Sequence, residues 1–470
     1  MSGRPLLQLG AVAVLLVAAC RVSSSAPDPA RVSIDLKQQY QTITGWEATA
    51  EAGQEEPGAE QFVPQALDAA VDLGITRLRL EVLSGAEHRR DLWTERREGR
   101  VDERTYECLR YATVNDNSDP AVMNQDGFQF SGLDHRVATV VLPFKKRLEA
   151  RGRALHLNVN YVAFTKGICG DSAYDHDRPE EYAEFVIATA LHLRETFGLV
   201  ADTWEAILEP DKTASWSGRQ VGEAIVAAAR RLRAHGFATK FVAPSCANMG
   251  TSATYFDEIS KVPGAIEELA ELSYHRYAGV SERSLRALAS RATEHGLGTA
   301  MLEKIGASYP ELHADLKIGN ASSWQQFTLA YPERDNGAQY FTVSPDGESF
   351  DVRPGARTRY LRQYFAYVRP GARRIEASSN ATGFDPVAFR NVDGRVVVIV
   401  EADGPGVFAL DGLPAGRYET SYMTAAGNVT SVNARSIVAG TSYDAEMPGA
   451  GVLTVAAVRD VSEGAGGEGP

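Results

Sequence analysis

Short apolar runs typical of β-strands alternate along this chain with longer segments that carry a helical pattern. Eight runs are strand candidates, at residues 42–48, 75–82, 155–162, 207–211, 241–245, 272–277, 301–304 and 324–331. Segments with apolar residues three and four positions apart separate most of them, at 137–151, 180–197, 221–235, 281–295 and 357–368. This alternation predicts an α/β fold, a (β/α)8 TIM barrel over residues 41–368. An open doubly wound sheet is the alternative, which the lack of a glycine-rich phosphate loop disfavours.

A second pattern begins after residue 368. Short alternating runs separated by turn residues extend over 369–458 and predict a β-sandwich, and residues 31–40 provide a further strand for it. Residues 85–133 lack the helical pattern and predict a long loop that forms a wall of a substrate cleft. The glycine-rich acidic tail at 459–470 is expected to be disordered. The net charge of −13 argues against a nucleic-acid partner.

The first residues resemble a bacterial lipoprotein signal. Arg4 precedes an apolar run that is too short to span a membrane comfortably, and the run ends at Cys20. We therefore expect residues 1–19 to be a signal peptide, Cys20 to carry a lipid, and residues 20–30 to include a tether. This places the protein outside the cytoplasm on a bacterial membrane, in the periplasm or at the cell surface. An ordinary secretory signal that happens to precede a cysteine is the alternative.

Three further cysteines follow. Cys108 and Cys169 fall in the loops after the second and third predicted strands, which are neighbours at one barrel face. A disulfide between them suits an extracytoplasmic protein, and two free thiols are the alternative. Cys246 is expected to be buried and inert.

Two glutamates end strand-like runs. Glu209 and Glu303 are 94 residues apart, which is about three strand-helix-strand steps of roughly 30 residues each, so they would close the fourth and seventh strands and face one another across the barrel mouth. Glycoside cleavage requires two such carboxyl groups. A single glutamate at a strand end is more often a helix cap or an ion-pair partner. Other polar and aromatic residues fall on or just beyond predicted strands, and they favour a functional site: Arg79, Asn158, Asn160, His275, Tyr277 and Trp324.

Other acidic residues invite different interpretations. Glu205 shares strand parity with Glu209, and a buried structural role suits it better than catalysis. Glu47 and Glu81 end other strands and are candidates for substrate subsites. The cluster from Asp175 to Asp177 could suggest a metal site, but its place before Pro179 favours turn and helix-cap chemistry.

These features resemble the clan A glycoside hydrolases, and within them family 30 and its relatives, over residues 31–458. The cues are Gln41 to Ile43, Arg77 to Arg79, the Glu209–Pro210 pair, Tyr274–His275, Glu303, and the later runs 375–378 and 388–400. The resemblance implies a retaining double displacement without metal or other cofactor.

In that mechanism Glu209 is the general acid/base and Glu303 the nucleophile. Arg79, His275 and Tyr277 would support the nucleophile. Trp324 would offer an apolar platform to a sugar, or else close the barrel core. We also expect Trp46, Asn158, Asn160 and Asn248 to bind substrate or support the site.

One position departs from the family pattern. Leu208 stands where the family has an asparagine that binds the sugar 2-hydroxyl. The change indicates an unusual substrate, a substitute donor from Asn158, Asn160 or Asn248, or loss of activity. The sequence thus predicts a membrane-tethered retaining β-glycoside hydrolase that acts on a glycan or glycoconjugate. A catalytically inactive carbohydrate-binding lipoprotein on the same fold is the alternative.

Overall fold

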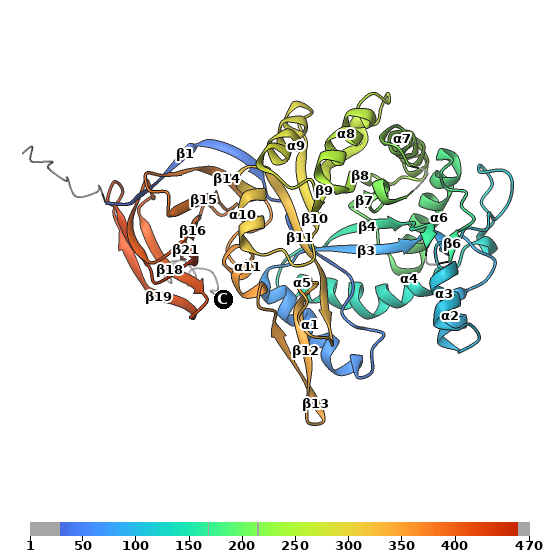
Figure 1. The fold of residues 1–470 in the computed structure, drawn as a ribbon, viewed down its shortest axis with the longest axis horizontal. Coiled ribbons are helices and arrows are strands. Elements are labelled where there is room, and N and C mark those ends of the chain that lie inside the picture. Colours follow the sequence, from blue (N-terminus) through green and yellow to red (C-terminus); the bar gives the residue numbers. More distant parts are fainter. Residues whose placement is uncertain (1–28, 168, 214–215, 459–470) are drawn as a thin grey trace, which may run out of the picture.

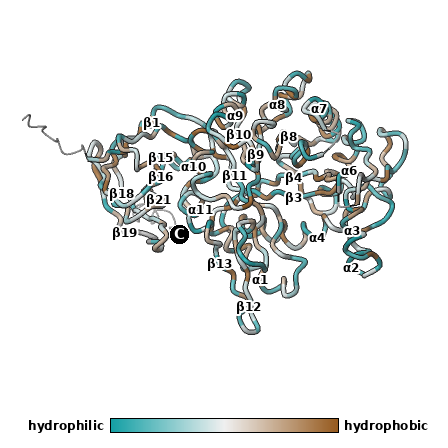
Figure 2. The backbone as a smooth tube through the Cα atoms, in the orientation of Figure 1, coloured by the Kyte–Doolittle hydropathy of each residue, from teal (hydrophilic) through white to brown (hydrophobic). Residues whose placement is uncertain are grey.

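The computed structural model describes residues 29–167, 169–213 and 216–458. Two β-rich domains lie side by side, a barrel with its helices and a smaller all-β domain (Figure 1). The predicted signal peptide, Cys20 and the glycine-rich tail lie outside the described residues. No helix in the described part is both long and apolar enough to cross a bilayer, and hydrophobic and hydrophilic residues are interspersed along the helices (Figure 2).

Eight parallel strands form the barrel. They are β2 (Gly45–Thr49), β3 (Arg77–Leu83), β4 (His156–Val162), β7 (Thr203–Glu205), β8 (Lys240–Asn248), β9 (Leu269–Ala278), β10 (Gly298–Glu303) and β11 (Ala321–Tyr331). Each strand pairs with the next, and β11 pairs with both β10 and β2. The sheet therefore closes on itself. The predicted TIM barrel is confirmed, and the open sheet is excluded.

Helices surround the barrel. They are α1 (Ala59–Leu73), α5 (Leu142–Glu149), α6 (Pro179–Phe197), α7 (Gly218–Ala234), α8 (Met249–Ile259), α9 (Glu282–Glu294), α10 (Tyr309–Lys317) and α11 (Thr358–Phe365). Helix α7 shows why the sequence forms a helix here. The Ser217 side chain accepts from the backbone of Gln220, whose own side chain bonds back in a capping box. Its buried alanines then pack inward together with Val221, Ile225 and Leu232.

Residues between β3 and β4 form short helices, most of them within residues 85–133, where the sequence predicted a loop. They are η1 (Ser84–Ala86), α2 (Leu92–Arg97), α3 (Glu103–Leu109), η2 (Gln125–Gly127), α4 (Ser131–Arg136) and η3 (Val137–Val141). The last of them, η3, and the following α5 fall in the predicted helix 137–151. Asp91 and Asp102 cap α2 and α3. These helices have only two turns or fewer, so their apolar periodicity is too short to recognise, and their caps are the better signal.

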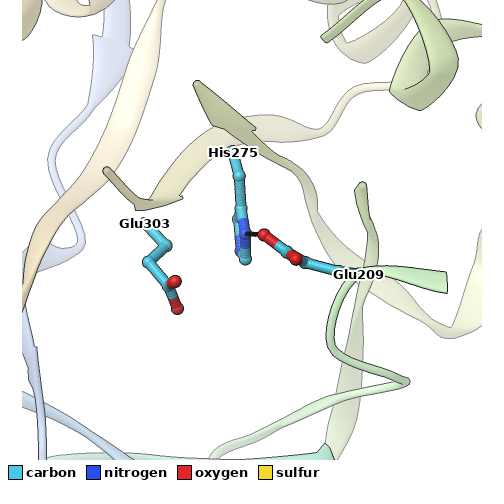
Figure 3. A group of neighbouring side chains, drawn as sticks. All are labelled: Glu209, His275 and Glu303. Atoms are coloured by element: carbon cyan, nitrogen blue, oxygen red, sulfur yellow. Dashed lines mark hydrogen bonds and ion pairs between the residues drawn. The ribbon is translucent and has the colours of Figure 1, made fainter. Parts of the chain in front are cut away.

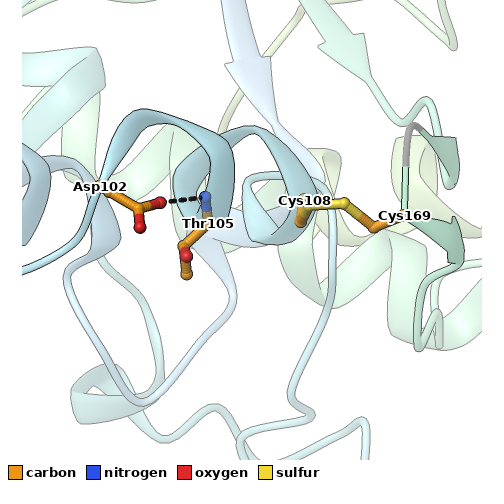
Figure 4. The surroundings of a disulfide bond; sticks show 4 residues. All are labelled: Asp102, Thr105, Cys108 and Cys169. Carbon is orange, nitrogen blue, oxygen red and sulfur yellow. Dashed lines mark hydrogen bonds between the residues drawn. A yellow bond between two sulfur atoms is a disulfide. The ribbon is translucent and has the colours of Figure 1, made fainter.

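A disulfide holds this insertion. Cys108 on α3 is bonded to Cys169, with Cα atoms 5.5 Å apart (Figure 4). Cys169 lies beside the small hairpin β5 (Lys166–Gly167) and β6 (Gly170–Asp171) that follows β4. The bond therefore joins the loops after β3 and β4. Cys246 is free and buried.

The second domain is one continuous nine-stranded sheet in the part of the chain described. Its strands are β1 (Arg31–Thr42), β14 (Arg373–Ser379), β15 (Phe384–Arg390), β16 (Val396–Ala402), β17 (Gly406–Asp411), β18 (Gly416–Thr424), β19 (Gly427–Ile437), β20 (Tyr443–Met447) and β21 (Gly451–Ala457). Apolar residues from β1, β16, β17 and β21 share one core. This makes the sheet sandwich-like, as predicted.

The two domains are joined directly. β1 runs antiparallel to β14, with Val32 opposite Ser379, and the chain passes from it into β2 within a few residues. Helix α11 contacts β18 and β21, and the Gln363 side chain accepts a hydrogen bond from the Ser421 hydroxyl.

The remaining elements lie between those named. The hairpin β12 (Gln339–Asp346) and β13 (Ser349–Pro354) extends the barrel sheet and projects from it (Figure 1). Short turns η4 (Pro210–Lys212) and η5 (Ile266–Glu268) follow β7 and precede β9.

Candidate active site

Glu209 follows β7 on an unusual backbone. Its φ of 47° and ψ of 60° lie in the left-handed region, which non-glycine residues adopt mainly where the surrounding structure enforces it. The Glu209 N–H donates to the Ser245 carbonyl at 3.1 Å. Two residues later, the Asp211 carboxylate accepts from the N–H groups of Ala247 and Asn248 at 2.9 and 3.1 Å. These bonds attach the segment to β8 and fix the direction of the Glu209 side chain.

Glu303 is the last residue of β10 and carries a paired carboxylate. Arg79, on β3, donates from Nη2 to its Oε2 at 2.5 Å, and the Tyr277 hydroxyl, from β9, donates to its Oε1 at 2.8 Å. Burial raises the pKa of the Glu303 carboxyl, but Arg79, His275 and Tyr277 outweigh it, and the pKa lies below its ordinary value. Glu303 is therefore ionised at neutral pH, as a nucleophile must be.

His275, on β9, lies between the two glutamates (Figure 3). Its Nδ1 is 3.0 Å from Glu209 Oε1. Burial alone would lower the pKa of this imidazole, but the carboxylates of Glu205, Glu209 and Glu303 raise it to about 9. The imidazolium thus donates to Glu209 at neutral pH.

The two glutamates are close. One donor atom from each of Glu209, His275 and Glu303 lies within 4.8 Å of the others. Such spacing could surround a cation. Here, however, the Arg79 guanidinium and the His275 imidazolium already supply positive charge to both carboxylates, so we assign none of the three as a metal ligand.

The carboxyl groups remain reachable. The side chains of Glu209 and Glu303 are 13% and 10% exposed, while Tyr277 is 37% exposed. Phe327, near the end of β11, is half-buried, with its ring centroid 5.7 Å from the Arg79 guanidinium carbon. We therefore identify Phe327 and Tyr277 as the aromatic side chains that border this site.

Trp324 and Trp46 do not lie in the site, which corrects the expectation for both. Each is fully buried, and each packs against Phe365 of α11. Their indole N–H groups donate to Asp315 and to the Val368 carbonyl. Adjacent strand residues face opposite sides of a sheet. Both tryptophans therefore face the helices, and the inward aromatic residue on β11 is Phe327, three positions beyond Trp324.

The three asparagines that could substitute for the family asparagine lie in different settings. Asn158 is buried, donates to Glu47 and accepts from Thr203. Asn160 is fully buried on the barrel interior. Asn248 caps α8, because its Oδ1 accepts from two backbone N–H groups of that helix. Leu208 is itself nearly buried, at 6% exposure.

Glu47 and the 175–177 cluster, both considered from the sequence, belong to the framework and not to the site. Glu47 pairs with Arg77 at 2.7 Å deep in the barrel. His176, from the 175–177 cluster, contacts Glu87 at 2.5 Å and Tyr161 at 2.8 Å, all buried. Glu87 is 89 residues away in the chain, so no local pattern could pair them. Glu81 is different, because it lies 3.4 Å from Arg79 at the edge of the site.

Comparison with known proteins agrees with this architecture. Residues 371–405 match the model of the glycosyl hydrolase family 30 beta sandwich domain. Among solved structures, the chain is similar to the catalytic domain of the family 30 xylanase C from Talaromyces cellulolyticus, with a TM-score of 0.64 and 15% identity, covering 91% of this chain and 100% of that one.

Two further structures are comparably similar. The family 30 subfamily 8 xylanase from Clostridium acetobutylicum gives a TM-score of 0.63 at 15% identity, over 91% of this chain and all of that one. An endo-β1,6-glucanase gives 0.62 at 13% identity, over 93% and 95% of the two chains. The fold is thus that of the family 30 glycoside hydrolases, and the resemblance to clan A and family 30 is confirmed.

Proposed function

We propose that this protein is a retaining β-glycoside hydrolase with Glu303 as nucleophile and Glu209 as acid/base. The observation that carries the proposal is the spacing of the two carboxylates, which have oxygens within 4.8 Å of one another at a barrel mouth. Retaining glycosidases hold their carboxyl groups about 5 to 5.5 Å apart, whereas inverting enzymes need about 6.5 to 9.5 Å to admit a water molecule. The approach of one oxygen from each carboxylate to this distance favours the retaining arrangement.

The residues suit the two steps of a double displacement. Glu303 attacks the anomeric carbon while Glu209 donates its proton to the departing glycosidic oxygen, and a covalent glycosyl–enzyme ester forms. Glu209 then removes a proton from water, the water oxygen attacks the same carbon, and Glu303 leaves as carboxylate. Arg79 and Tyr277 hold Glu303 ionised before attack and receive the carboxylate again after hydrolysis.

The substrate in this proposal is a glycan or glycoconjugate. The similar structures include xylanases and an endo-β1,6-glucanase, so β-linked polysaccharides are the first substrates to try. Phe327 and Tyr277 present aromatic surface beside the carboxylates, which suits the apolar face of a sugar ring.

The test is the stereochemistry of hydrolysis. Purified protein is screened with aryl β-glycosides and β-linked polysaccharides, and the first product of an active substrate is followed by NMR. We expect the β-anomer first, with the α-anomer appearing only by mutarotation. An α-anomer as first product would exclude Glu303 as nucleophile.

One observation favours a second candidate, a carbohydrate-binding protein without catalysis. Leu208 stands beside the acid/base and offers only a hydrocarbon side chain, and Asn158 and Asn160, two of the three predicted substitutes for the family asparagine, are fully buried. Glycan binding without turnover by any substrate in the screen, with equal affinity in Glu303→Gln, would favour this candidate.

We also propose that the protein is tethered to a bacterial membrane outside the cytoplasm through a lipid on Cys20. The motif ending at Cys20 supports this, and it lies outside the described residues. Mass spectrometry of the mature amino-terminal peptide should show an acylated cysteine. Cys20→Ala should release the protein from the membrane fraction, and an unmodified Cys20 would contradict the proposal.

A further inference from the structure

A third glutamate lies deeper in the barrel than the two at its mouth. Glu205, the last residue of β7, is fully buried. Neither of its carboxylate oxygens has a hydrogen-bond partner among the residues described. Its neighbour across the strand pair, Asn160, is also buried, and its amide is likewise unpartnered within the described chain. A buried carboxylate without hydrogen bonds is costly, so Glu205 needs a charged partner.

That partner is His275. Its Nε2 is 3.7 Å from Glu205 Oε1, an ion-pair distance that is too long for a hydrogen bond, and Nε2 has no hydrogen-bond partner among the residues described. Its Nδ1 is 3.0 Å from Glu209 Oε1. The imidazole is fully buried between them. A neutral imidazole carries a proton on only one nitrogen, so it would turn a bare lone pair toward one of the two carboxylates. Only the doubly protonated ring turns an N–H toward each carboxylate.

We propose that Glu205 is a positioning residue that holds His275 doubly protonated, so that His275 always presents an N–H to Glu209. Glu205 touches neither the substrate nor the reacting atoms. It acts through His275, which fixes the direction of the Glu209 carboxyl group at the mouth. The role in turnover rests on the proposed glycosidase function, whereas the effect on His275 does not.

Other charged groups around His275 do not replace Glu205. Glu303, on β10, also favours the imidazolium, but Arg79 on β3 holds that carboxylate directly. Tyr277, on β9 itself, has its ring 6.3 Å from the imidazole and donates its hydroxyl to Glu303. Glu209 is the group to be oriented. Glu205 is thus the carboxylate on the Nε2 side of the ring.

The sign of the effect follows from the imidazole. The raised pKa of His275, about 9, means that the second N–H is present below that pH and is lost above it. Removing the Glu205 charge removes one cause of the increase, so the proton should leave at lower pH. The positive charge that His275 presents to Glu209 would then be lost at a pH where the parent protein still retains it.

The test is NMR titration of the histidines in protein labelled at histidine, with His275→Asn to assign the signal. We expect Glu205→Gln to move the His275 midpoint down by at least about one pH unit. Glu205→Asp, which keeps the charge, should restore most of the shift. Glu47→Gln is the matched control, because Glu47 is an equally buried barrel glutamate that pairs with Arg77 instead.

An unchanged His275 midpoint in folded Glu205→Gln, or an equal shift in Glu47→Gln, would overturn the proposal. If Glu205→Gln does not fold, Glu205→Ala replaces it: removal of the carboxylate should lower the His275 midpoint in the same direction, and an unchanged midpoint would contradict the role. With an active substrate, the alkaline limb of kcat/KM should move down in parallel. If no active substrate is found, the glycosidase proposal fails, but the titration of His275 still decides the role of Glu205.

Discussion

The interiors of the two domains contrast in chemistry. The barrel encloses buried charged residues on its inner strand faces, including Glu47, Arg77, Arg79, Glu205 and Glu271. The core of the sandwich is built from valine, isoleucine, leucine, tyrosine and similar residues. Burying ions costs free energy that pairing often only offsets, whereas apolar burial stabilises directly. The barrel interior therefore contains charged groups that can serve a site at its mouth, whereas the sandwich interior contributes mainly to stability.

The barrel charges themselves are layered. Arg77 lies deepest, bonded to Glu47 at 2.7 Å and to Glu271 at 2.9 Å. Arg79, two residues nearer the mouth, is bonded to Glu303. The deeper set is closed by its own pairs, and the upper set borders solvent. We expect substitutions in the upper set to change activity and those in the sandwich core to change stability.

The strongest test of this contrast is Glu303→Gln. Loss of the nucleophile should lower kcat by about 10⁴-fold or more. Each tenfold loss in rate corresponds to an increase of about 1.36 kcal/mol in the activation free energy. Glutamine keeps the shape, so thermal unfolding should show a folded protein. Glu223→Gln, on the exposed side of α7, is the control. Full activity in Glu303→Gln would exclude Glu303 as the nucleophile and with it the proposed catalytic pair.

Glu209→Ala should have a large effect that depends on the leaving group. A general acid contributes about 10² to 10⁴ in rate, and an activated phenol needs little protonation to depart. We therefore expect strong loss with a poor leaving group and much less with dinitrophenol, measured as kcat/KM for an aryl-glycoside series. Equal losses across the series would contradict the acid/base role.

Leu453→Ala tests the sandwich side of the comparison. Leu453 is fully buried in the core shared by β1, β16, β17 and β21. Truncation should reduce the free energy of unfolding by about 2 to 5 kcal/mol, measured by denaturant titration. The kcat/KM of the folded protein should stay unchanged. A matching fall in kcat/KM would show that the sandwich supports the site as well as the fold.

Tyr277→Phe should give the smallest effect. It removes one hydrogen bond to the Glu303 carboxylate, and such bonds to charged groups contribute about 1.5 to 3 kcal/mol. We expect kcat/KM to fall about ten- to hundredfold while stability hardly changes, because Tyr277 is partly exposed. No change in activity would mean that Arg79 alone maintains the nucleophile.

The sequence predicted the large, periodic features of the molecule. Seven of the eight predicted strands overlap barrel strands, because strand and helix periods differ clearly over such lengths. The fourth was predicted at 207–211, whereas β7 covers only Thr203–Glu205 and the apolar residues after it form the loop that carries Glu209. Glu209 and Glu303 come together because parallel strands end at one face. The short helices α2 and α3 were missed, since two turns give too little periodicity to separate from a loop.

The side-chain detail was harder to predict. Its aromatic chemistry predicted Trp324 as a platform for a sugar, but strand parity places Phe327 in the site instead. The left-handed backbone of Glu209 and the Glu205–His275 pair depend on residues distant in the sequence. Such pairings are decided by how strands align around the barrel, which a single sequence does not reveal.

The strand β1 has a consequence for synthesis. It precedes every other strand and helix described and leaves the ribosome before them, yet its partners in β14 and β17 follow it by more than 300 positions, as the pairing of Val32 with Ser379 and Leu410 shows. Domains generally fold as units during synthesis. The whole barrel can therefore form while β1 still waits with unpaired edges, and the second domain is completed last, by joining the two ends of the nascent chain.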